Sequence, residues 1–112
     1  MIGGHYLPDG LLRAVAGLYE KHRQTAFPRR LVVDDVNGVE MVSLDSTVSG
    51  CVHTWLKDRG HIHDRGWDTL AECEQVLNRA IPALDGDEAS YYRRLLDMTV
   101  LILTSPEAAQ PE

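Results

Sequence analysis

Residues 31–44 read LVVDDVNGVEMVSL, with an Asn-Gly pair near the centre. Asn37-Gly38 is a strong signal for a tight two-residue turn, because both residues tolerate a positive φ. Apolar residues lie on both sides of the pair, as they do in the two strands of a hairpin. The stretch therefore predicts a β-hairpin with strands near residues 30–36 and 39–44.

A two-residue loop would place Val36 opposite Val39 and Val33 opposite Val42. Neither face of this hairpin would be polar. One face would carry Leu31, Val33, Val42 and Leu44, and the other Val32, Val36, Val39 and Met41. A lone two-stranded hairpin is marginally stable in water, so this one is expected to pack on helices, on another strand or on another chain.

Working outward, apolar residues recur with the spacing of amphipathic helices on both sides of the hairpin. The first helix is expected around residues 11–19, before Pro28. The second is expected to start at the capping residues 45–47 and to stop at Gly60. Together with the two helices that follow, these segments predict an α+β domain, mostly helical, with the hairpin between the first and second helix.

A third helix is expected from Asp64, with Pro82 kinking or ending it. The fourth follows Asp87 and is apolar on more than one side, which is typical of a helix in the middle of a bundle or under a partner. Residues 98–103 fit either a helix or a strand. All of these elements are expected in one compact domain, residues 1–104, followed by a flexible tail at 105–112.

Composition favours a soluble bacterial protein of the cytoplasm. No signal peptide is visible at the start of the chain, and no apolar stretch has the length of a membrane span. The two cysteines are expected to be reduced thiols, and the preference for arginine over lysine is typical of a GC-rich genome. A net charge of -6 disfavours nucleic acid as a partner, because an acidic surface repels phosphates.

Cysteine and histidine are the residue types that bind zinc, and five of them could form a metal site: Cys51, His53, His61, His63 and Cys73. Their spacing argues against such a site. Two residues apart on a helix, Cys51 and His53 point about 200° away from each other. We therefore expect no cofactor, with zinc as the alternative.

No catalytic signature is present, so no catalytic residue is assigned. Tyr and Arg dominate binding hot spots, and the apolar helix and hairpin faces favour contact with another protein. The residues expected at such an interface are Tyr91, Tyr92, Arg93, Arg94, Met98 and Ile102 of the last helix, and Val36, Val39 and Met41 of the hairpin.

The leading functional hypothesis is a non-catalytic, acidic protein-interaction module that forms a homo-oligomer or binds a protein partner. A metal-binding or small-ligand-binding protein that uses the histidines and cysteines is the alternative. A small enzyme that uses a histidine and a carboxylate in a helix-lined pocket is the third.

Overall fold

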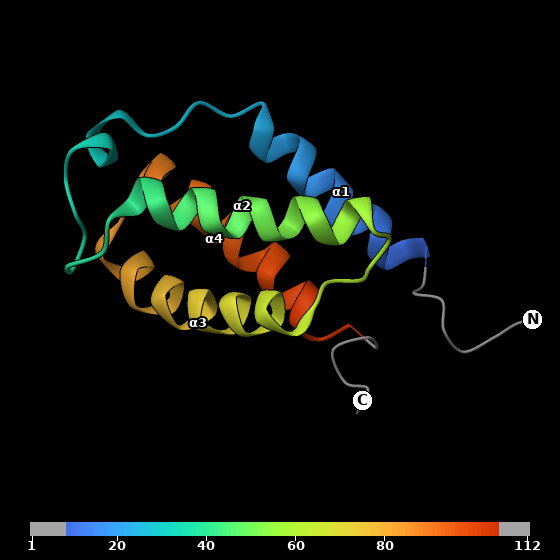
Figure 1. Cartoon of the computed structure of the whole chain (residues 1–112). Helices are drawn as coiled ribbons and strands as arrows, with labels where there is room; N and C mark the ends of the chain where they lie inside the picture. The colour runs from blue at the N-terminus through green and yellow to red at the C-terminus, as the bar shows by residue number, and fades with distance from the viewer. Residues whose placement is uncertain (1–8, 106–112) are drawn as a thin grey trace, which may run out of the picture.

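The computed structural model describes residues 9–105, which form a bundle of four α-helices with two short 3-10 helices (Figure 1). The α-helices are α1 (Asp9–Arg23), α2 (Met41–Lys57), α3 (Asp64–Ala80) and α4 (Gly86–Leu103), and the 3-10 helices are η1 (Arg29–Val32) and η2 (Ile81–Ala83). Helix α4 is central, because it packs against α1, α2 and α3. The prediction of an α+β fold is wrong, since the described part of the chain contains no β-strand.

The Asn-Gly turn forms, but the hairpin does not. Asn37 and Gly38 have φ values of 52° and 81°. Val36 and Val39 exchange both backbone hydrogen bonds at 2.9 Å. This pair is an isolated bridge, and no strand extends from it. The turn therefore reverses the chain without starting a sheet.

The expected second strand is instead the first turn of α2. Met41 and Leu44 are buried on the same stripe as Val48 farther along the helix, so the helical period extends back past the predicted start at residues 45–47. Glu40 caps the helix, because its carboxylate accepts the backbone N–H groups of Val42 and Ser43.

The expected first strand is split between two environments. Arg29–Val32 form η1, in which Leu31 is buried, while Val32 and Val33 face solvent. An exposed valine pair cannot line a packed strand face. The four hydrophobic residues of the expected strand therefore divide evenly: Leu31 and Val36 are buried, and Val32 and Val33 remain on the surface.

The helices after α2 lie where the sequence places them. Helix α3 begins at Asp64, and its last residue leads into η2, which contains Pro82. Residues 98–103 are helical, so α4 runs unbroken to Leu103. Helix α4 is apolar on more than one side because three other helices, α1, α2 and α3, pack against it.

A tight connection joins α2 to α3. Arg59 and Gly60 have φ values of 57° and 98°, and the Gly60 N–H donates to the Trp55 carbonyl at 2.7 Å. This bond and the left-handed conformation of Arg59 end α2 in a Schellman-type C-cap. Ile62 then packs against Gly66 so closely that a Cβ there would collide with its side chain.

The segments at both chain ends are largely outside the described residues. The tail expected at 105–112 lies outside them except for Ser105, which is buried. Among the helices that are described, none is long and apolar enough to cross a membrane.

Candidate functional site

A buried polar cluster joins three helices. His22 is in the last turn of α1, Asp45 in the second turn of α2 and Tyr91 near the start of α4. The His22 Nε2 atom lies 2.7 Å from Asp45 Oδ1, and the Tyr91 hydroxyl donates to Asp45 Oδ2 at 2.8 Å. The hydroxyl of Ser49 also donates to Asp45, at 3.2 Å. One carboxylate therefore accepts hydrogen bonds from α1, α2 and α4.

The contact with Asp45 determines which ring nitrogen of His22 carries the proton. An ionised carboxylate can only accept, so Nε2 carries the proton in the neutral imidazole and Nδ1 is left with a lone pair. Nδ1 is buried and has no hydrogen-bond partner among residues 9–105. His22 is 5% exposed, so a substrate cannot reach this ring without a local opening of the bundle.

Aromatic rings close over the polar cluster. The ring of Tyr91 lies 4.4 Å from that of His22, and Phe27 meets Tyr91 edge to face at 5.5 Å. Tyr92 donates its hydroxyl to the Met41 carbonyl at 2.7 Å. Burial, with the nearby Asp45 charge, raises the pKa of Tyr91 and of Tyr92, so both phenols stay protonated as donors.

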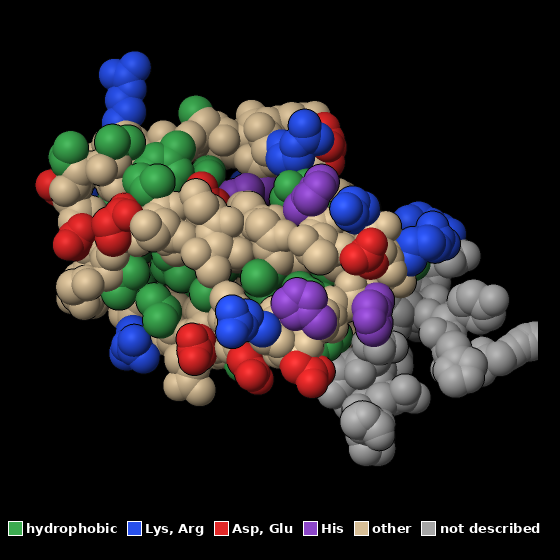
Figure 2. Space-filling model, viewed as in Figure 1, with side chains coloured by type: hydrophobic (Ala, Val, Ile, Leu, Met, Phe, Trp, Pro, Cys, Tyr) green, Lys and Arg blue, Asp and Glu red, His purple; other side chains and the backbone are tan. Residues whose placement is uncertain are grey.

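The residues proposed as metal ligands are spread over α2, the α2–α3 connection and α3. His53, His61 and His63 are exposed, and His53 lies against the ring of Tyr19. In the described part of the chain, no three His, Cys, Asp or Glu side chains are grouped so that they could hold a metal ion. Figure 2 shows the histidines at separate places on one face.

Both cysteines are free thiols on the α2 and α3 helices. Cys51 is half-buried and Cys73 is buried. Burial raises the pKa of Cys51, and it raises the pKa of Cys73 to about 11, with smaller contributions from Cys51 and Glu72. These thiols are therefore protonated at neutral pH, whereas the thiolate is the form that attacks substrates and binds metals.

Most residues expected at a protein interface lie inside the monomer. The buried members of that set are Tyr91, Tyr92, Met98, Ile102, Val36 and Met41. Val39 is partly buried, Arg93 is exposed, and Arg94 is partly exposed and donates to the Thr25 hydroxyl at 3.2 Å. The apolar pattern of these segments is therefore satisfied by packing within one chain.

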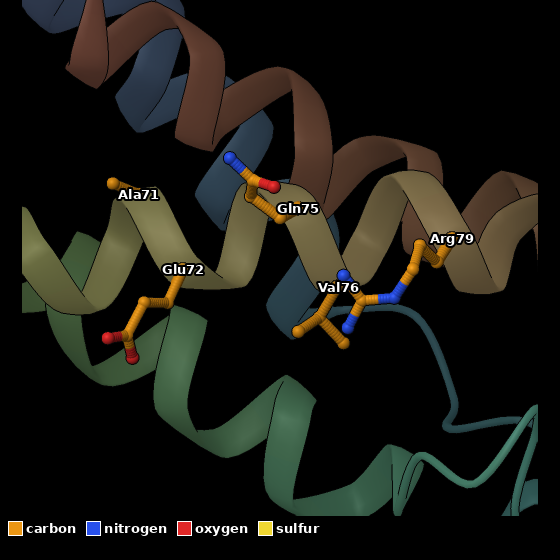
Figure 3. Close-up of a pocket in the computed structure, with 5 residues that line it drawn as sticks. All are labelled: Ala71, Glu72, Gln75, Val76 and Arg79. Carbon is orange, nitrogen blue, oxygen red and sulfur yellow. The ribbon is translucent and has the colours of Figure 1, made fainter.

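Two open hollows lie on the α2 and α3 side of the bundle. A groove of about 350 Å³ runs between α2 and α3, lined mainly by small and polar residues such as Thr47, Gly50 and Thr69. A second hollow, of about 410 Å³, is lined by residues of α3 alone. Figure 3 shows its Arg79 side chain extending back along α3 in the direction of Val76. Neither hollow includes His22 or Asp45.

Three large hydrophobic side chains are exposed near η1. Val32 is 59% exposed, Val33 is 82% exposed and Val42, in the first turn of α2, is 38% exposed. We call these residues the valine patch. Figure 2 shows hydrophobic side chains gathered over η1 and the start of α2, with a basic side chain above them and acidic side chains below.

Sequence reasoning missed the polar cluster. It assigned no role to His22 and treated Asp45 as a helix cap. A signal was present, because His22 continues the apolar stripe of α1 one turn after Leu18 and seven residues after the buried Val15. A polar residue on such a stripe requires a partner inside the protein.

No protein-family model matches the chain, and comparisons with curated proteins and with solved structures found no match.

Proposed function

We propose that this chain is a non-catalytic protein-interaction module whose binding surface is the valine patch. The observation that carries the proposal is the exposure of two adjacent valines, Val33 at 82% and Val32 at 59%. Burying a valine fully is worth about 1.5–3 kcal/mol. A protein that covered the patch would gain a few kcal/mol that the free chain does not.

The patch is held in place before any partner binds. Leu31 anchors η1 in the core, and Arg30 forms two hydrogen bonds with the Glu88 carboxylate on α4, at 2.8 and 2.9 Å. Because the connection is fixed on both α2 and α4, its exposed valines keep one geometry. Such preorganisation lowers the entropy cost of association.

The buried polar cluster supports a structural role over a catalytic one. His22 and Asp45 are within hydrogen-bond distance, as an acid–base pair requires. However, His22 is 5% exposed and the Asp45 side chain is 17% exposed, and Asp45 already accepts from Tyr91 and Ser49. The cluster therefore joins α1, α2 and α4 and has little capacity left for a substrate.

We also propose a location in the cytoplasm and a partner other than nucleic acid. The free thiols of Cys51 and Cys73 suit a reducing compartment. The net charge of -6 disfavours binding to a phosphate backbone.

Photo-crosslinking in the native host tests the proposal. A benzoylphenylalanine residue replaces Val33 in the full chain, and the control carries it at Asn78, an exposed position on α3. We expect a discrete crosslinked protein from position 33, none from position 78, and a weaker product when Val32→Asp is added. Equal products from both positions would overturn the proposal.

A further inference from the structure

We infer that the partner of the valine patch is a second copy of this chain, bound about a two-fold axis that passes close to Val32. This inference rests on the proposed function, since it names the occupant of the same surface. It is carried by the charges on either side of the valines, at Arg29 and Asp35, both of which are exposed.

The charged residues of this segment divide into two kinds. Arg30 is engaged within the chain, by Glu88 at 2.8 Å and by Asp34 at 3.7 Å. In contrast, neither Arg29 nor Asp35 forms an ion pair with any residue from 9 to 105. Along the sequence, the two valines therefore lie between Arg29 and Asp35, neither of which is ion-paired within residues 9–105.

A two-fold axis makes this arrangement self-complementary. In such a dimer the same patch faces itself, so that a residue i meets residue j of the other copy, and j meets i. Arg29 precedes the valines by three positions and Asp35 follows Val32 by three. We place the axis close to Val32, the midpoint of this order, so that Arg29 of each copy pairs with Asp35 of the other in the proposed dimer.

The energetics point to a weak dimer. The valine contact is small, and ion pairs at an exposed rim add little to affinity. Each copy has a net charge of -6, but the general repulsion is largely screened at physiological salt, where the Debye length is about 8 Å. The two Arg–Asp pairs chiefly set the register and exclude wrong arrangements, because like charges placed opposite each other weaken association.

Charge reversal tests the arrangement with matched variants. Sedimentation equilibrium is run from about 5 µM to about 500 µM on the full chain, on R29D, on D35R and on the double variant R29D/D35R. We expect the full chain to dimerise. Each single variant places like charges together at both pairs, and we expect its dimer to be at least about tenfold weaker.

Restoration of the dimer is the decisive result. The double variant, and an equimolar mixture of R29D with D35R, both recover two Arg–Asp pairs. We expect each to dimerise within about threefold of the original affinity. Far-UV circular dichroism on every variant checks folding, which both exposed substitutions should preserve.

The outcomes separate this inference from the proposed function. The inference is overturned if the full chain stays monomeric over the whole concentration range. It is also overturned if the affinity of the dimer is the same in R29D and D35R as in the full chain. If position 33 still crosslinks to a different protein in the cell, the proposed function stands without it. If neither a dimer nor a crosslink is found, both fail.

Discussion

Two connections of the bundle contain the same backbone feature and use it differently. Asn37-Gly38, in the α1–α2 connection, and Arg59-Gly60, in the α2–α3 connection, are both pairs of residues with positive φ. The first pair forms a β-type turn between Val36 and Val39. The second ends a helix through the bond from Gly60 to the Trp55 carbonyl.

This difference shows that a pair of residues with positive φ does not determine whether the neighbouring residues form a strand or a helix. Helix α2 ends at Lys57, two residues after its last buried residue, Trp55, and the Arg59-Gly60 pair follows. The Asn-Gly turn is followed by a buried stripe with helical spacing from Met41, so helix replaces strand. The α1–α2 connection is also held mainly by side chains, whereas the α2–α3 connection is held by backbone and close packing. Substitutions that remove side-chain contacts and substitutions that strain the backbone should therefore lower the stability of the protein by different amounts.

The largest effect is expected from Asp45→Ala in the polar cluster that joins α1, α2 and α4. It leaves His22, Tyr91 and Ser49 without their shared acceptor, and we expect a loss of about 3 kcal/mol in the free energy of unfolding. Urea denaturation measures this loss. The control is Asp34→Ala, at an exposed surface pair, which should change stability by less than about 0.5 kcal/mol. Equal losses in the two variants would show that the cluster does not stabilise the bundle more than an exposed ion pair does.

The Tyr91 hydroxyl should make the stability that the polar cluster contributes sensitive to alkali. Burial raises the pKa of Tyr91 in the folded protein above the ordinary value of about 10. Its contribution is therefore present below about pH 10 and lost as the pH rises further. We expect Tyr91→Phe to be less stable at pH 8 by about 1–2 kcal/mol, and the gap to the unchanged protein to narrow above pH 10. Urea denaturation at several pH values measures the gap, and a constant gap would contradict the assignment.

Alanine substitutions at Gly38 and Gly60 allow the stability of the two connections to be compared directly. Alanine at a positive φ costs about 1–2 kcal/mol. We expect Gly60→Ala to cost about 2 kcal/mol, since Gly60 is buried and its N–H ends α2. Gly38→Ala, with open space around its Cβ position, should cost about 1 kcal/mol. Thermal unfolding of both variants checks the order, and a larger loss at Gly38 would reverse the comparison.

The smallest effect is expected from Glu88→Gln, which weakens the surface attachment of η1. The melting temperature should fall by no more than about 2 °C. The hydrogen bond from Arg30 lowers the pKa of Glu88, so this contribution is present at neutral pH and lost as the pH falls below about 4. Melting curves at decreasing pH should therefore show the difference between the variant and the unchanged protein shrinking as the Glu88 carboxylate becomes protonated.

Local signals predicted much of the fold, but not the fold class. The stop of α2 before Gly60 and the turn at Asn37-Gly38 follow from positive φ values that act over a few residues, and α3 begins at Asp64 as expected. The start of α2 could not be predicted in this way, because its cap, Glu40, is not among the favoured capping residues. Counting Met41 and Leu44 with the stripe of α2 would have revealed it.

The candidate site was harder to predict than the fold. His22, Asp45 and Tyr91 are far apart in sequence, and only the packing of α1, α2 and α4 brings them together. The same packing buried most of the apolar residues that resembled an interface. Exposure of Val33 could not be inferred either, since a 3-10 helix and a strand place the same residues on different sides.

The buried thiol of Cys73 gives the bundle an internal reporter of its own motions. With a pKa of about 11 and a position between packed helices, it meets an alkylating reagent only when the region around it opens. The labelling rate therefore depends on how often this region opens, as well as on the reactivity of the opened thiol. The half-buried Cys51 supplies an internal reference in the same molecule.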